Sequence, residues 1–343
     1  MRAYYDNLIL SRVERKKKYK KKFVKWILLS ILMLIITISV IVGYSYFKLI
    51  NNISEPNLEI PIIDDPPAII TPKLEDQSFA ILLIGLDYRQ ETGSCNTDAL
   101  IVSIINPSTN KISLLSIPRD SKVYLSDYGF VKINSVYAKG EHERIIQERS
   151  GQKSTINGSS LLMKTLSDFL EIPINYYVNV DFKGFETIID QLGGLEIYVD
   201  RDMNYYSAAD GTNINLKEGL QILDGDKSLD YARFRKSSDG NDSNDFERNQ
   251  RQQELIKNFV DEITSIKGAS KMISILDITG EHVKVNMTHE ELTSLFWKYK
   301  GIDSNDIESI IMESYWESPY VIIEQDELKR IKLELKNAFQ SET

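Results

Sequence analysis

Four arginines close together in the chain are suited to chemistry on a highly anionic ligand. Arg233 and Arg235 would share a face in extended backbone, where side chains alternate. Arg248, Arg251 and Gln252 follow at helical spacing, so the two segments can converge on one phosphate group. A guanidinium stays charged and binds phosphate oxygens in a bidentate geometry. The alternative is a solvated turn in which the arginines pair with nearby carboxylates, at Asp239, Asp242, Asp245 and Glu247.

Two aspartates stand where predicted strands meet their loops. Asp87 follows the apolar run 79–85, and Asp98 immediately precedes the run 99–105. Arg119 comes directly after a third predicted strand and so joins the same edge of the sheet. Carboxylates beside phosphate-binding arginines suit a hard divalent cation, which keeps several waters and bridges phosphate oxygens. The set predicts a magnesium pyrophosphate site, although each aspartate alone would also fit a turn or a helix cap.

The elements that must position these residues are short apolar runs alternating with helical patterns. Residues 176–180 and 195–199 are predicted strands, whereas 158–170, 182–192 and 253–266 place apolar residues at helical intervals. Strands that are apolar throughout are buried on both faces of a sheet. The alternation predicts an α/β fold with a central sheet covered by helices on both faces.

The first 47 residues predict a membrane anchor. Residues 1–25 carry ten cationic and two anionic side chains, net +8, and the run 26–47 is apolar. Its 22 residues would span roughly 33 Å as a helix, enough for a bilayer core and too long for a signal peptide. The basic flank predicts a cytoplasmic tail and a single-pass protein of the cell membrane. Residues 48–75, with five prolines, predict an extended linker to an extracellular domain at 76–343.

Charge and composition exclude several other classes of protein. The whole chain has a net charge of −9, so residues 26–343 carry −17, which argues against a nucleic-acid partner. Cys95 is the only cysteine, and therefore no intrachain disulfide is possible. The three histidines are far apart and show no zinc-ligand spacing. Aromatic residues near the C-terminus are expected in the core, namely Trp297, Trp316 and Tyr320.

Seven strings across residues 79–260 carry a resemblance to a known family. In chain order they are ILLIGLDYR, NTDALIVSI, SIPRD, KINSVYAKG, VDFKGFETIIDQLGGLEIYV, LDGDKSLDYARFR and DFERNQRQQ. They resemble the signatures of the LytR-CpsA-Psr family. The resemblance implies a three-layer α/β/α sandwich with a central mixed β-sheet, which holds a polyprenyl-pyrophosphate lipid outside the cell. It also implies transfer of a glycopolymer, such as wall teichoic acid or a capsular or secondary wall polysaccharide, from that lipid to peptidoglycan.

The resemblance assigns roles residue by residue. Asp87 and Asp98 match magnesium-associated aspartates, and Lys164 matches a phosphate-binding lysine. The pyrophosphate-binding positions correspond to Arg119, Arg233, Arg235, Arg248 and Gln252. Arg251 belongs to the motif but receives no separate role, and a structural ion pair is equally compatible with it. The chain departs from the family pattern at Asn96, usually arginine, at Gly140-Glu141, usually two glycines, and at 141–157, which read as a polar insertion.

The leading hypothesis is a magnesium-dependent phosphotransferase at the bilayer surface. A peptidoglycan hydroxyl would attack the sugar-linked phosphorus and release polyprenyl phosphate, with Asp98 and Arg119 as the catalytic residues. Asp98 or Asp87 could instead take the proton of the acceptor, but ligation of the metal is preferred. Two alternatives remain, a pyrophosphatase in which water replaces the acceptor, and a non-catalytic lipid-binding or regulatory protein. The loss of arginine at Asn96 is the main argument for a weakened or purely binding member.

Overall fold

The computed structural model describes residues 76–89, 94–208, 211–240, 242–265, 282–299 and 301–340, together with residues 271, 275 and 280. The predicted cytoplasmic tail, transmembrane helix and linker lie outside the described residues. Within the described part, no helix is both long enough and apolar enough to cross a membrane.

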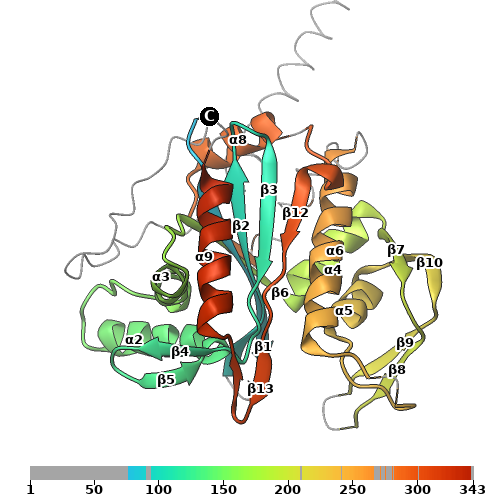
Figure 1. The fold of residues 1–343 in the computed structure, drawn as a ribbon, viewed down its shortest axis with the longest axis horizontal. Helices are drawn as coiled ribbons and strands as arrows, with labels where there is room; N and C mark the ends of the chain where they lie inside the picture. The colour runs from blue at the N-terminus through green and yellow to red at the C-terminus, as the bar shows by residue number, and fades with distance from the viewer. Residues whose placement is uncertain are drawn as a thin grey trace, which may run out of the picture. The chain divides into compact units, whose positions relative to one another are not determined.

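A mixed six-stranded sheet forms the centre of the fold, as predicted (Figure 1). Its strand order is β11-β6-β1-β2-β3-β12. β1 is antiparallel to β2 and parallel to β6, and β3 is antiparallel to β2 and parallel to β12. The strands are β1 (Phe79–Arg89), β2 (Ser94–Asn106), β3 (Lys111–Ser116), β6 (Tyr176–Asp181), β11 (Val283–Val285) and β12 (Ile307–Ile310).

Helices pack on both faces of this sheet because successive side chains along each strand point to opposite faces, and both faces are apolar. On one face, Ala80, Leu82 and Ile84 pack with α3 (Gly158–Leu170) and α9 (Gln325–Phe339). On the opposite face, Phe79 and Ile81 belong to a core that includes α8 (His289–Tyr299). α6 (Asp245–Thr264) covers Ile101 and Leu114 on this second face. The period of two along β1 thus supplies two separate cores.

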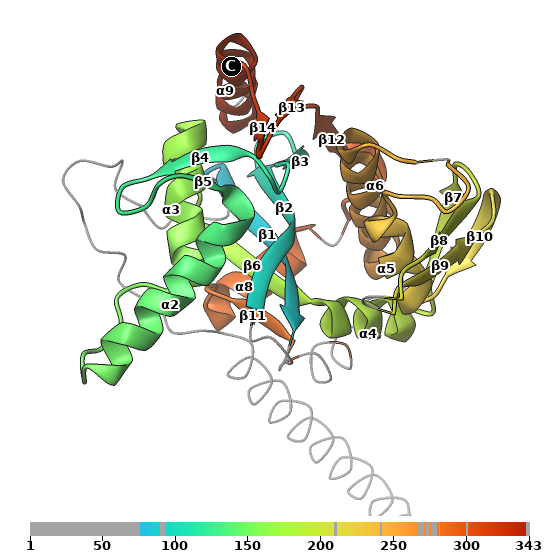
Figure 2. The ribbon, with the colours of Figure 1, turned by 90° about the horizontal axis from the view of Figure 1, so that it is seen from below.

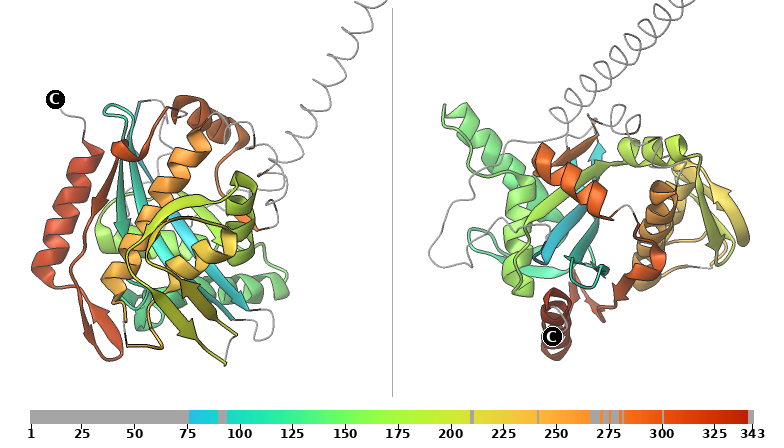
Figure 3. Two further views of the ribbon diagram at one scale, coloured as in Figure 1. Left: turned by 90° about the vertical axis from the view of Figure 1, so that its right-hand side faces the viewer. Right: turned by 90° about the horizontal axis from the view of Figure 1, so that it is seen from above.

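A smaller lobe with its own core stands beside the sheet. It consists of α4 (Phe182–Leu192), β7 (Leu195–Val199), β8 (Met203–Tyr206), β9 (Asn213–Leu216), β10 (Gly219–Leu223) and α5 (Gly225–Arg233). α6 lies between this lobe and the sheet (Figure 3). Its Leu255 packs into the core of the lobe, whereas Ile256 and Val260 pack on the sheet. One helix is therefore held by two cores, which fixes the side chains at its N-terminal end.

The segment predicted as a polar insertion begins inside a helix. α2 (Val136–Arg149) continues through Gly140 and Glu141, and residues 150–157 lead to α3. A Cβ on Gly140 would lie 2.6 Å from the carbonyl oxygen of Asn157, so glycine allows the two helices to approach closely. Asn157 caps α3 in a capping box with Ser160. Residues 141–149 therefore form the outer part of α2, in which no side chain is buried, whereas Ser154 and Asn157 of the following loop are buried.

Two hairpins complete the end of the sheet where β1 and β3 finish and β2 begins (Figure 2). They are β4 (Lys122–Leu125) with β5 (Gly129–Lys132), and β13 (Tyr315–Glu317) with β14 (Tyr320–Ile322). The expectation that Trp297, Trp316 and Tyr320 are core residues is wrong for both tryptophans. Trp297 is 61% exposed and Trp316 is 54% exposed, whereas Tyr320 is half-buried.

Candidate functional site

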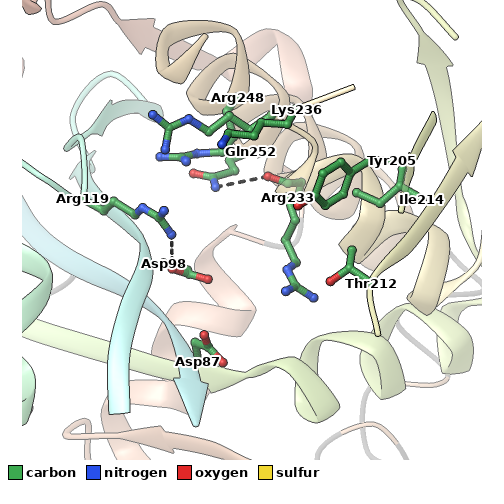
Figure 4. Close-up of a pocket in the computed structure, with 12 residues that line it drawn as sticks. Asp87, Asp98, Arg119, Tyr205, Thr212, Ile214, Arg233, Lys236, Arg248 and Gln252 are labelled. Carbon is green, nitrogen blue, oxygen red and sulfur yellow. Dashed lines mark hydrogen bonds and ion pairs between the residues drawn. The ribbon is translucent and has the colours of Figure 1, made fainter. Parts of the chain in front are cut away.

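A cavity of about 360 Å³ opens between the sheet and the smaller lobe (Figure 4). Seven of the eight predicted site residues line it: Asp87, Asp98, Arg119, Arg233, Arg235, Arg248 and Gln252. The others in the lining are Tyr205, Thr212, Ile214, Ala232 and Lys236. Five cationic and two anionic side chains give this lining a net charge of +3, in a chain whose net charge is −9. The cavity therefore suits an anion.

A β-bulge aims Asp98 into the cavity. Both aspartates lie within strands, so their predicted position at strand ends is wrong. Gly85 pairs with Ala99 and Leu86 pairs with Thr97, which leaves Asp98 as the extra residue of β2. A bulge bends its strand and redirects the side chain it carries. Figure 4 shows both Asp98 and Asp87 among the residues that line the cavity.

Arg119 sits in a tight loop after β3. The hydroxyl of Ser121 donates to the carbonyl of Pro118 at 2.7 Å, and the amide of Asn134 donates to the carbonyl of Arg119 at 3.0 Å. These bonds hold the backbone so that Arg119 Nη1 lies 2.6 Å from Asp98 Oδ1. Its Nε is buried and has no hydrogen-bond partner among the described residues. The bond to Asp98 uses one of the five N–H donors of Arg119, and the Nε–H is among those left for a ligand.

Arg248 is the most buried cation in the cavity, with 5% of its side chain exposed. Its Nη1 lies 3.0 Å from Asp245 Oδ1, an ion pair without hydrogen-bond alignment, and its buried Nε lacks a partner in the described structure. Asp245 also pairs with Arg235 at 3.3 Å. Burial lowers the pKa of Arg248, and the neighbouring cations of Arg119 and Arg235 lower it further. One carboxylate between two arginines leaves positive charge for a ligand to neutralise.

Arg233 and Arg235 reach the cavity from a helix end rather than from the predicted extended strand. Arg233 is the last residue of α5, and the backbone leaves the helix at Phe234. Phe234 is fully buried in the lobe, so the flanking arginines are both directed away from that core. The guanidinium of Arg233 lies 4.9 Å from the ring centroid of Phe182, a cation–π contact that orients it.

Arg251 has a structural role, and its partners are not carboxylates. It is buried one turn beyond Arg248 on α6. Its guanidinium donates to the carbonyls of Tyr231 and Phe234 and to the hydroxyl of Ser243. These bonds hold the chain that carries Arg233 and Arg235. Gln252 donates to the carbonyl of Ala232 at 3.5 Å and closes the same wall (Figure 4).

Comparisons with known proteins decide the family. A sequence profile of the LytR_cpsA_psr family matches residues 47–337. The chain belongs to this family. TagV of Bacillus subtilis (strain 168), named a polyisoprenyl-teichoic acid–peptidoglycan teichoic acid transferase, is 30% identical over 305 residues, covering 84% of this chain and 71% of TagV.

Solved structures in this family have the same fold. The crystal structure of B. subtilis TagV matches with a TM-score of 0.61 and 28% identity, covering 79% of this chain and all of that one. The structure of TagT bound to LI-WTA matches with a TM-score of 0.58 and 26% identity. This match covers 83% of this chain and 97% of TagT.

Lys164, assigned by the family resemblance, lies outside the cavity lining. It is on α3, and its ammonium group lies 2.9 Å from Asp168 one turn further on. By contrast, the hairpin β8–β9 supplies Tyr205, Thr212 and Ile214, which no sequence signal singled out. Lys236 could have been found, because it directly follows the arginine pair.

The donor set fits a magnesium ion bound together with a phosphate ligand. The described residues contain no group of three or more side chains that would hold a metal by themselves. Mg²⁺ commonly takes only one or two carboxylates and fills its remaining positions with water and substrate phosphate. Asp87 and Asp98 both line the cavity and would supply these two carboxylates.

Proposed function

We propose that this protein transfers a glycopolymer, wall teichoic acid or a capsular or secondary wall polysaccharide, from a polyprenyl-pyrophosphate carrier to peptidoglycan. The observation that carries the proposal is the convergence of four arginines and two aspartates, from five separate segments, on one cavity of net charge +3. The name of TagV, which states the same type of transfer, supports it. The proposal also places residues 26–47 across the cell membrane and the cavity on its outer side.

The arginines would hold the pyrophosphate and stabilise its charge during transfer. Arg119 and Arg248 each have a buried Nε without a hydrogen-bond partner in the described residues, and phosphate oxygens are suitable acceptors. Arg235 lies beside Arg248, with which it shares Asp245, whereas Arg233 lies across the cavity from Arg119 (Figure 4). A magnesium ion at Asp87 and Asp98 would neutralise the phosphate oxygens. Preorganised charge of this kind lowers the barrier because it stabilises the transition state more than the bound substrate.

In the proposed reaction, a hydroxyl of peptidoglycan attacks the phosphorus atom that is linked to the sugar. A new phosphorus–oxygen bond forms to the acceptor, and the bond to the polyprenyl phosphate breaks. The leaving polyprenyl phosphate carries away the electron pair, and the hydroxyl proton passes to solvent or to an aspartate. Holding both groups in line supplies much of the acceleration.

The test is a transfer assay with the full-length protein in detergent. It uses a synthetic polyprenyl-pyrophosphate saccharide, magnesium and a peptidoglycan oligomer, and the products are analysed by mass spectrometry. Saccharide covalently linked to the oligomer is expected, and Arg119→Ala should abolish it. Arg149→Ala, an exposed arginine at the end of α2, is the matched control. Free phosphorylated saccharide alone would identify a pyrophosphatase, and lipid binding without any product would identify a binding protein.

A further inference from the structure

The outer face of the β4–β5 hairpin carries two aromatic and two lysine side chains in a regular arrangement. Tyr124 lies opposite Phe130, and Lys122 lies opposite Lys132. Side chains two residues apart share a face, so all four point outward, while Val123 between them is buried. Tyr124 and Phe130 are 63% and 59% exposed, and their ring centroids are 5.5 Å apart.

The β13–β14 hairpin extends this face. Tyr320 donates a hydrogen bond to the carbonyl of Phe130 at 3.1 Å. The ring of Trp316 lies 5.3 Å from the ammonium group of Lys132. The two hairpins therefore form one continuous surface. We call it the aromatic surface; it consists of Tyr124, Phe130, Trp316, Tyr320, Lys122 and Lys132.

The opposed lysines do not stabilise the hairpin itself. Two lysines directly opposite each other destabilise an antiparallel pair. Lys132 is paired with Asp120 at 2.9 Å, whereas Lys122 lies over the rings of Phe130 and Tyr320 at 4.6 and 5.5 Å. Exposed apolar residues scattered singly are ordinary, but a contiguous group marks an interaction site. The aromatic surface has the composition of a site that binds a partner.

The aromatic surface adjoins the cavity through the loop that carries Arg119. Lys122 follows Arg119 by three residues, and the amide of Val321 on β14 donates to the carbonyl of Asp120 between them at 2.9 Å. Figures 1 and 2 show both hairpins at the end of the sheet where β3 finishes. The hairpin β8–β9 lies on the opposite side of this end of the sheet from β4–β5. A polymer lying on the aromatic surface would therefore pass close to the phosphate site.

We infer that the aromatic surface docks the glycan strand of the acceptor, an inference that rests on the proposed function. The C–H groups of a sugar ring pack on the electron-rich faces of aromatic rings. Lys122, the exposed lysine of the surface, would pair with a carboxylate, and peptidoglycan carries carboxylates along its length. The surface also exposes Asp127 and Glu317 at its edges. Such mixed charge suits a polymer with both amines and carboxylates better than an anionic bilayer.

The first test measures binding to insoluble peptidoglycan. Full-length protein in detergent is incubated with the polymer and sedimented, and its apparent Kd is compared with that of a Phe130→Ala, Trp316→Ala double variant. Loss of two stacking residues is expected to weaken binding by about tenfold or more. Trp297→Ala is the matched control, because Trp297 is similarly exposed on α8. Equal binding by the double variant would overturn the inference, provided that thermal unfolding shows it to be folded.

Arg119→Ala separates failure of docking from failure of the proposed function. This variant should sediment with peptidoglycan as the parent does while losing transfer. If the parent protein binds through the aromatic surface but transfers nothing, the docking inference stands and the proposed function fails. Transfer at full rate by the double variant would overturn docking and leave the function intact.

A fluorescence measurement tests the bilayer as the competing occupant. A protein with Trp316 as its only tryptophan, made by Trp26→Phe and Trp297→Phe, is reconstituted into vesicles that contain brominated lipids. Brominated acyl chains quench tryptophans that enter the bilayer. Unchanged emission, and a spectral shift when soluble peptidoglycan fragments are added, are expected. Quenching by the lipids would assign the surface to the membrane and overturn the inference.

Discussion

Replacement of Arg248 by methionine should separate ligand binding from stability. Arg248 is buried beside Arg119 and Arg235 and shares Asp245 with Arg235. Removing its charge relieves repulsion and leaves Asp245 paired, and an apolar replacement of a buried ion is often neutral or stabilising. We expect the free energy of unfolding to change by about 1 kcal/mol or less, which corresponds to a melting-temperature shift of about 2–4 °C.

Replacement of Arg251 by methionine should have the opposite consequence. Arg251 donates to two backbone carbonyls and to Ser243 inside the protein. Leaving buried acceptors without a donor costs about 1–3 kcal/mol each, so a total loss of about 3–5 kcal/mol is expected. The two arginines lie three residues apart on one helix, which makes the variants a matched pair.

The assay is thermal unfolding with and without a short-chain prenyl pyrophosphate, combined with calorimetric titration of the same ligand. Arg248→Met should lose one or two charged hydrogen bonds to the ligand, at about 1.5–3 kcal/mol each, and its Kd should rise about tenfold or more. If Arg248→Met instead unfolds as early as Arg251→Met without ligand, Arg248 is a structural residue and the argument from its burial is wrong.

Three further predictions concern acidic and polar residues near the cavity. Asp98→Asn should lower transfer by about 100-fold and weaken its dependence on magnesium, measured as initial rate against magnesium concentration. Burial raises the pKa of Asp230 to about 6. The contribution of this carboxyl group to the free energy of unfolding is therefore complete below pH 4, and it is lost as the pH rises through 6. Urea unfolding should therefore show Asp230→Asn to be stabilising by about 1 kcal/mol at pH 7.5, after allowance for solvent screening, and not at pH 4. Asn96 lies opposite Asp87 in the β1–β2 pair, so Asn96→Arg should tighten pyrophosphate binding several-fold at low salt, and equal affinity would contradict this.

Much of the fold could be predicted because apolar periodicity is a local property. The apolar runs within β1, β2 and β3 and the spacing in α3 and α4 all form the predicted elements. Helices on both faces follow from strands that are apolar throughout. The hairpins β8–β9 and β13–β14 were not predicted, since each strand has only three or four residues and too few positions to show a period.

The chemical class of the site was determined by the sequence alone. Residue type decides charge and hydrogen-bonding geometry, so arginines with aspartates predict an anion site where the chain folds them together, and the metal at the aspartates stays a prediction. The tertiary structure decided which arginine faces the cavity and which one holds the backbone. Arg248 and Arg251 have the same type and nearly the same place on one helix, yet one faces the cavity and the other is bonded to carbonyls.

Tertiary structure also decided where Asp98 points and which aromatics are exposed. Asp98 faces the cavity because a bulge breaks the register between β1 and β2, and register depends on the partner strand. Trp316 is exposed because it lies on β13, whose three residues are all exposed, while β14 makes the hydrogen bond to Phe130; a tryptophan in the sequence is equally compatible with a core. Contacts between segments far apart in the chain decide both the direction of Asp98 and the exposure of Trp316. Residue type and local spacing do not predict such contacts.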